Sequence, residues 1–173
     1  MILYNAGESK TPINSDDFVK YMEKSAKKGY VKALFNYATY SKIPERLPFL
    51  EKAAAKGHME SIYYIGCLYV MNYKNISVNE EKAIPYLKIA ADNGYVEAMA
   101  RYAKILVYGK GDKSNIEEAL PYILKAVEKG NLHAMCIYAY MLEAGNGVPM
   151  DKNKAQSYFK KAADLGHPGA KLL

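Results

Sequence analysis

Small and large residues recur along the chain at fixed distances from a set of five glycines, namely Gly29, Gly57, Gly94, Gly130 and Gly166. A small residue lies four positions after each glycine, and an aromatic residue lies eight positions before it. Successive glycines are separated by 28, 37, 36 and 36 residues. Because chance would not supply this register five times, the pattern predicts a chain built from repeats.

The hydrophobic spacing inside each repeat predicts two antiparallel helices. Apolar residues precede each glycine at steps of three and four, as at Ala155, Tyr158 and Ala162, which is the period of a helix. The glycine then adopts the left-handed conformation that ends a helix, and another helix begins almost at once. We call the helix after each glycine the first helix of a repeat and the helix that ends at a glycine the second helix. Nine helices are expected, at residues 15–28, 31–41, 46–56, 59–73, 80–93, 96–108, 116–129, 132–144 and 152–165, with a helical stub from Pro168.

Polar residues and prolines mark where the second helices begin. Asn79, either Ser114 or Asn115, and Asp151 are predicted N-caps, because their side chains can accept a bond from a free backbone N–H group. A proline inside a helix costs about 3 kcal/mol. A late helix start or a kink is therefore expected at three prolines, each nine residues before its glycine: Pro48, Pro85 and Pro121.

Composition places the 173-residue chain among folded proteins, since 50% of its residues are hydrophobic and 24% are charged. No apolar run approaches the roughly 18–20 residues of a membrane span. The first residues show no basic segment followed by an apolar one, so no signal peptide is predicted. Only Cys67 and Cys136 are present, too few for a disulfide framework. A cytoplasmic location is therefore expected.

The chain carries a formal net charge of +6. Its lysines concentrate on the second helices with acidic residues among them, and they are not interleaved with aromatic residues. This distribution favours a solvated face over a nucleic-acid site.

Residues able to carry chemistry are sparse. His58, His133 and His167 lack the spacing of metal ligands and have no acid–base partner near them in sequence. Cys67 and Cys136 occupy different positions in different repeats, so free thiols packed near the helices are expected. Neither a phosphate-binding loop nor a nucleophile motif is present. We predict no catalytic residue, no metal and no cofactor.

One repeat can be written from Ala134 to Gly166: a first helix of the form Ala-x-x-x-Tyr-Ala-x-x-Leu-x-x-Gly, the loop Asn-Gly-Val-Pro-Met-Asp, and a second helix with Tyr158 and two alanines before its glycine. This pattern resembles the Sel-one-like repeat, a relative of the tetratricopeptide repeat. The resemblance covers residues 15–173 and implies an all-α fold, a right-handed superhelix (solenoid) of antiparallel helix pairs with about four to five repeats. Residues 1–14 would form a lead segment. The first repeat is shorter than the others, so residues 41–45 are expected to turn tightly.

The chain has 17 tyrosines, and their positions in the repeat divide them. Tyr30 and Tyr95 follow a glycine directly and are expected to pack at the turn. Eight others occupy positions predicted to lie in the core: Tyr21, Tyr37, Tyr69, Tyr86, Tyr102, Tyr122, Tyr138 and Tyr158.

By analogy with the tetratricopeptide groove, positions 3, 6, 10, 13 and 14 after each glycine imply a concave surface formed by the first helices. The partner-binding residues implied there are Lys32, Phe35, Glu60, Tyr63, Met71, Glu97, Lys104, Tyr108, His133 and Tyr140. Four of these rings (Phe35, Tyr63, Tyr108 and Tyr140) are expected to form a broken, exposed aromatic stripe. In the alternative, several of these side chains pack under neighbouring repeats.

Aromatic and apolar residues with a few charges are typical of protein-binding surfaces. The sequence therefore favours a non-catalytic protein–protein interaction module, an adaptor or scaffold that binds a protein or peptide on its concave face. The alternative is a cytosolic immunity or inhibitor protein that neutralises a toxin. Nucleic-acid binding and enzymatic activity are less favoured.

Overall fold

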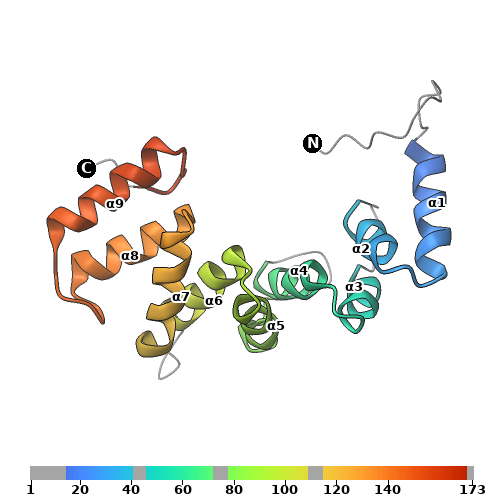
Figure 1. The fold of residues 1–173 in the computed structure, drawn as a ribbon, viewed down its shortest axis with the longest axis horizontal. Coiled ribbons are helices and arrows are strands. Elements are labelled where there is room, and N and C mark those ends of the chain that lie inside the picture. Colours follow the sequence, from blue (N-terminus) through green and yellow to red (C-terminus); the bar gives the residue numbers. More distant parts are fainter. Residues whose placement is uncertain (1–14, 41–45, 72–77, 109–114, 171–173) are drawn as a thin grey trace. The chain divides into compact units, whose positions relative to one another are not determined.

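The computed structural model describes residues 15–40, 46–71, 78–108 and 115–170, and within these ranges the chain forms nine α-helices and no strand (Figure 1). The predicted all-α repeat fold is confirmed. The helices are α1 (Ser15–Lys27), α2 (Val31–Tyr40), α3 (Leu47–Ala54), α4 (Met59–Val70), α5 (Glu80–Asp92), α6 (Val96–Tyr108), α7 (Ile116–Glu128), α8 (Leu132–Ala144) and α9 (Lys152–Asp164).

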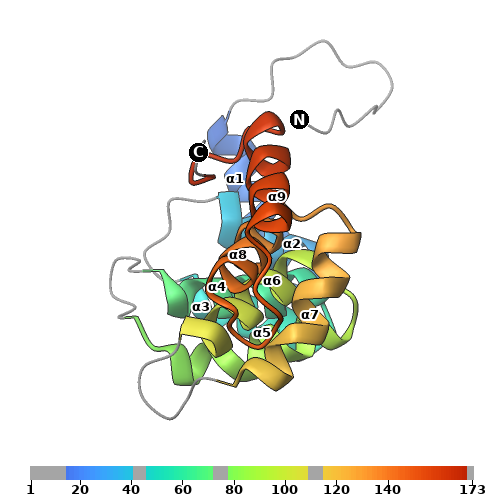
Figure 2. The same ribbon diagram turned by 90° about the vertical axis from the view of Figure 1, so that its left-hand side faces the viewer.

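The chain divides into two compact units, Met1–His58 and Met59–Leu173, which we call the N-terminal and C-terminal units. In each unit, helices that follow one another in sequence pack together. Figures 1 and 2 show this for α8 and α9, which lie side by side. In the C-terminal unit, α6 also contacts α8, so first helices of successive repeats lie next to each other. The predicted lead segment, the tight turn at 41–45 and the end of the chain lie outside the described residues.

Glycine permits the two backbone features that the repeat needs. The five repeat glycines all have a positive φ, between 78° and 89°, so the predicted left-handed helix ends are confirmed. Gly66 serves close packing instead, because a Cβ atom there would lie 2.8 Å from the side chain of Leu87 on α5. The small residue expected at this position thus lets α4 approach α5.

The second helices begin as the polar residues predict. The side chains of Asn79, Asn115 and Asp151 accept bonds from backbone N–H groups at 2.9, 3.0 and 2.9 Å. Pro48 lies in the first turn of α3, as expected for a late start. A late start is wrong for Pro85 and Pro121, which lie inside α5 and α7. A kink at these two prolines stays a prediction.

Those two helices start early because each combines an asparagine cap with two glutamates in its first turn. Caps contribute about 1 kcal/mol, and acidic residues favour the positive end of the helix dipole. Burial of Leu87 in α5 and of Ile123 in α7 adds to this, because both side chains are fully buried beyond the proline. Together these contributions offset the loss of the backbone hydrogen bond that proline, which has no N–H group, cannot donate.

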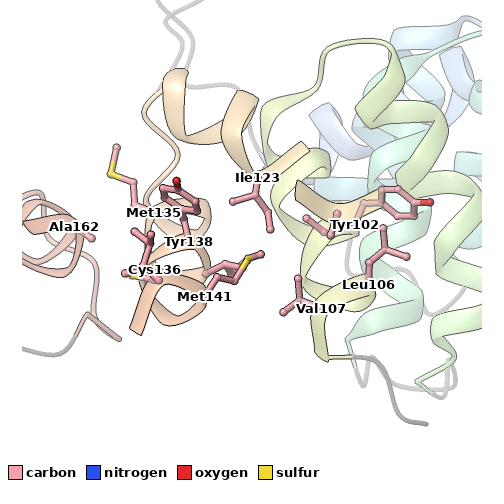
Figure 3. Close-up of a cluster of buried hydrophobic side chains, with 14 of the residues drawn as sticks. Tyr102, Leu106, Val107, Ile123, Met135, Cys136, Tyr138, Met141 and Ala162 are labelled. Carbon is pink, nitrogen blue, oxygen red and sulfur yellow. The ribbon is translucent and has the colours of Figure 1, made fainter. Parts of the chain in front are cut away.

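Rings from neighbouring helices meet inside each repeat. Tyr102 of α6 meets Tyr122 of α7 edge-on at 5.2 Å, and Tyr138 of α8 meets Tyr158 of α9 at 5.3 Å. Figure 3 shows the core around these contacts, where side chains from α6 and α8 surround Ile123 of α7. Tyr37 and Phe49 form the equivalent pair of the first repeat. In the second repeat Ile65 occupies the equivalent position, and Tyr86 instead stacks on Tyr69, four residues further along α4.

Burial of the eight predicted core tyrosines is uneven. Tyr37, Tyr102 and Tyr138 on the first helices are buried, whereas Tyr69 and the second-helix rings Tyr86, Tyr122 and Tyr158 are half-buried. The prediction is wrong for Tyr21, which is 69% exposed. Its counterparts each meet a ring from the preceding first helix, and among the described residues no helix precedes α1.

Two expectations at the turns need correction. Tyr95 packs at its turn against Tyr63, with ring centroids 4.8 Å apart, but Tyr30 is 63% exposed. The helical stub from Pro168 is wrong for the described residues, because residues 168 and 169 form a turn. The N–H group of Ala170 bonds to the carbonyl of His167 at 3.2 Å, which closes that turn rather than a helix.

Candidate functional site

A cleft of about 750 Å³ opens on the C-terminal unit. Most of its wall comes from the adjacent first helices α6 and α8, with Tyr63 from α4 and with His167 and Gly169 from the turn after α9. The α6 and α8 residues that line it are Glu97, Ala100, Arg101, Lys104, Val107, Tyr108, His133, Cys136, Ile137, Tyr140, Met141, Glu143 and Ala144, and Asn131 and Asn146 complete it.

Six of the ten predicted binding residues line this cleft: Tyr63, Glu97, Lys104, Tyr108, His133 and Tyr140. They come together because positions 3, 6, 10, 13 and 14 form one stripe along a helix, and because equivalent stripes of α6 and α8 lie beside each other. That they bind a partner stays a prediction.

The other four predicted residues do not line the cleft. Glu60 and Met71 belong to the C-terminal unit, where Met71 is 53% exposed just after α4. Lys32 and Phe35 lie on α2 of the N-terminal unit. Phe35 is half-buried, and its ring lies 5.0 Å from that of His58. Three rings of the predicted aromatic stripe therefore share this cleft.

Tyr63 is held in place by contacts on two sides. Its hydroxyl oxygen accepts a bond of 3.0 Å from Nε of Arg101, and its ring packs on Tyr95. Burial, with the thiol of Cys67 beside it, raises the pKa of Tyr63 to about 12, while Arg101 acts in the opposite direction. The phenol therefore stays neutral near pH 7 and can exchange hydrogen bonds with a ligand.

Tyr108 and Tyr140 differ in exposure. Tyr140 is half-buried, and its ring meets that of Phe159 on α9 edge-on at 4.8 Å. Tyr108 is 53% exposed at the end of α6, and partial burial raises its pKa. The expectation of an exposed stripe is thus confirmed for Tyr108 and wrong for Tyr63 and Tyr140, which also pack on neighbouring helices.

Two histidines from successive repeats form a bonded pair at the cleft. Nε2 of His167 lies 2.8 Å from Nδ1 of His133, and the N–H group of Gly169 donates to Nδ1 of His167 at 3.1 Å. Since Nδ1 of His167 accepts that bond, its Nε2 carries the proton and donates to His133. The Sγ atom of Cys136 lies 3.5 Å from the same Nδ1.

The surroundings of His133 disfavour its charged form. Burial, followed by the charges of His167, Arg101 and Lys104, lowers the pKa of His133. Burial raises the pKa of the Cys136 thiol, and both cysteines are free and buried. Among the residues with described positions, no group of three or more His, Cys, Asp or Glu side chains is arranged to hold a metal ion.

The contact between His133 and His167 is one that the sequence did not indicate. A partner from the next repeat lies 34 residues away, where no local motif indicates it. The structure shows a recurring contact between position 6 of one repeat and position 1 of the next. Three pairs show this contact: Phe35 with His58, Tyr63 with Tyr95, and Cys136 with His167.

Arg101 and Ile137 are further lining residues that the predicted positions omitted. Both occupy position 7 of a repeat, one helical turn after position 3. A stripe that includes position 3 and position 10 must also include position 7. The cleft thus combines cationic, anionic and apolar side chains.

No helix in the described ranges is long and apolar enough to cross a membrane. Comparison with known families gives a match to the Sel1 repeat, over residues 19–30, 49–58, 60–95, 96–131 and 132–167. A search among curated proteins finds no match.

Several solved structures are similar to this chain. A protective antigen present in uropathogenic Escherichia coli strains, described as displaying an SLR fold, is 25% identical with a TM-score of 0.78, over 88% of this chain and 34% of that one. A Sel1 repeat protein from Oxalobacter formigenes is 25% identical with a TM-score of 0.76, over 89% of this chain and 64% of that one. This chain thus spans less than two thirds of either protein.

Two immunity proteins from Pseudomonas aeruginosa share the fold more distantly. One is 20% identical with a TM-score of 0.54, over 92% of this chain and 61% of that one. The other is 16% identical with a TM-score of 0.56, over 93% and 64% of the two chains.

Proposed function

Since the chain belongs to the Sel1 repeat family, whose members are typically protein-interaction modules, we propose that it is a non-catalytic module that binds a protein or peptide partner in the cleft of its C-terminal unit. The cleft is the observation that carries this proposal. It gathers Tyr63, Tyr108 and Tyr140 from three successive first helices around a volume of about 750 Å³.

Several features of the cleft support a protein ligand. Tyrosine and methionine are enriched in protein interfaces because they bury a large area and tolerate water when unbound. Val107, Ile137 and Met141 add apolar side chains to the lining. The polar groups of the lining come from single residues spread along both helices, which suits the alternating side chains of an extended peptide.

The test is selection of binders from a display library of random peptides, followed by affinity measurements on variants. Tyr108→Ala should weaken binding by about 2 kcal/mol or more, as truncation of an interface hot spot does. The control is Tyr21→Ala, which removes a ring of α1 that is 69% exposed, against 53% for Tyr108. Binders that lose affinity equally with both variants, or with neither, would contradict the proposal.

A second candidate is an immunity or inhibitor protein that acts in the cytoplasm on a toxin. Its support is the fold shared with two immunity proteins, a likeness of fold alone at 20% and 16% identity. An inhibitor suppresses its partner's activity when bound, whereas an adaptor leaves it intact. Once a partner is in hand, assaying its activity or toxicity with and without this protein distinguishes the two. Cell fractionation tests the cytoplasmic location.

A further inference from the structure

Fixed charges in the cleft balance one another. Arg101 and Lys104 contribute two positive charges, and Glu97 and Glu143 contribute two negative charges. With neutral histidines the formal charge of the lining is therefore zero. Protonation of the histidine pair changes that sum, so the pair decides whether the cleft is neutral or positive.

These charges are spread unevenly along the cleft. Glu143 lies in the last turn of α8 and His133 in its first, about 15 Å apart along the helix at 1.5 Å per residue. Arg101 and Lys104 of α6 act directly on His133, as does His167. Glu97 offsets part of the charge of Arg101, which lies one turn further along α6. Arg101 and Lys104 thus act on His133, while Glu97 occupies on α6 the repeat position that His133 occupies on α8.

The histidine pair has no spare position for a second proton. Nδ1 of His167 accepts from Gly169, and the proton on its Nε2 points to Nδ1 of His133. Adding a proton to either ring places two N–H groups face to face or breaks one of these contacts. Cys136 offers no countercharge there, because burial raises the pKa of its thiol. A carboxylate entering the cleft would accept the released N–H bond and supply the missing negative charge.

We propose that the cleft takes a segment of a protein partner in which aspartate or glutamate lies near an apolar side chain, and that protonation of the His133–His167 pair tightens this binding. The carboxylate lies toward Lys104 and His133, and the apolar side chain packs toward Val107 and Tyr108. This inference rests on the proposed function. The net charge of +6 for the whole chain favours the approach of such a segment as well.

The probe is a set of peptides selected from a random library against the full chain at about pH 6, where histidine titrates. Binders that require Tyr108 should be enriched in aspartate and glutamate. By fluorescence anisotropy their affinity should be about tenfold higher near pH 6 than near pH 8, because a proton bound with the ligand links the two equilibria. Peptides in which these carboxylates are replaced by amides should bind more weakly, and their affinity should no longer depend on pH.

Two variants separate the charges involved. Lys104→Gln should lower the affinity for the acidic peptides roughly three- to fivefold, which is the contribution of an exposed ion pair. The control Lys125→Gln on α7 changes the net charge equally and should leave the affinity unchanged. His133→Gln should reduce the pH dependence to less than about twofold, because no proton remains to be linked. Circular dichroism melts of each variant check that it folds.

The outcomes separate this inference from the proposed function. Peptides that need Tyr108 but show no acidic enrichment, or that bind equally near pH 6 and pH 8, would overturn the inference and leave the protein-binding cleft standing. A library without any binder that depends on Tyr108 would overturn both.

Discussion

Single tyrosines in the cleft are divided between the core and the ligand surface. Tyr140 packs edge-on against Phe159, and Tyr63 is bonded to Arg101 and packed on Tyr95. Tyr108 is the most exposed of the three rings. Truncating each ring therefore changes stability and binding in different proportions.

Urea denaturation of three alanine variants should rank the rings by burial. Tyr102→Ala removes a ring that is 2% exposed and should cost about 3–5 kcal/mol. Tyr140→Ala should cost an intermediate amount, about 1–3 kcal/mol, because only part of the ring is packed. Tyr108→Ala should stay within about 0.5 kcal/mol of the wild type. If Tyr140→Ala were as stable as Tyr108→Ala, its ring would not belong to the packing between α8 and α9.

Acid should weaken the free protein through His133. Its pKa in the folded state lies below the ordinary value of 6.5, so between these two values the unfolded chain binds more protons. The stability that depends on neutral His133 is therefore fully present above about pH 6.5, and it is lost as the pH falls toward the pKa of His133 in the folded state. Thermal melts from about pH 8 to pH 5 should show this fall, and His133→Gln should flatten it.

At the scale of helices, a polar cluster joins three elements of the C-terminal unit. Lys88 of α5 pairs with Glu118 of α7, and the hydroxyl of Tyr102 on α6 donates to the same carboxylate at 2.7 Å. Lys88 and then Tyr102 lower the pKa of Glu118. The lysine also lies over the rings of Tyr102 and Tyr122. The helices therefore share one charged contact at the edge of the aromatic core.

A double-mutant cycle with Lys88→Met and Glu118→Gln should reveal this contact. The coupling energy should be about 1 kcal/mol, since the pair is partly exposed but also bonded to Tyr102. The pair Glu23–Lys27 on α1, four residues apart and more exposed, should give a smaller coupling in the same urea experiment, because solvent screens it. Equal coupling in both pairs would show that Tyr102 adds nothing to the Lys88 contact.

Helix ends were predictable from sequence because their causes are local. The caps at Asn79 and Asp151 depend on residues within one turn, and the left-handed glycines on their own backbone. The interior prolines show where local rules fail, because the burial of Leu87 against residues of other helices, such as Tyr102, helps α5 to tolerate Pro85. The bond between Arg101 and Tyr63 escaped prediction for the same reason, since it joins α6 to α4.

At the scale of the molecule, the period of the repeat was the feature of the sequence from which most of the cleft could be predicted. A stripe on one first helix recurs on the next, so six lining residues could be inferred without coordinates. Contacts between different positions of successive repeats, such as Cys136 with His167, need the actual stacking geometry. The division of the chain after His58 also has no marker in the repeat register.

This division predicts that the C-terminal unit can fold and bind alone. Each repeat is stabilised by its neighbours, and residues 59–173 contain α4 to α9 and every residue that lines the cleft. A fragment of residues 59–173 should give a helical circular dichroism spectrum and melt cooperatively. The 58-residue N-terminal unit buries a smaller core and should be marginal alone, since domains below about 60 residues rarely bury enough surface.

Peptides selected with the full chain should bind the 59–173 fragment within about threefold of their original affinity, a difference of under 1 kcal/mol. Calorimetry on both proteins measures this directly, and Tyr108→Ala made in the fragment should weaken binding as it does in the full chain. A folded fragment that no longer binds would mean that side chains of α1 to α3 touch the ligand. Lys32 and Phe35, the predicted binding residues of α2, would then be the first positions to mutate.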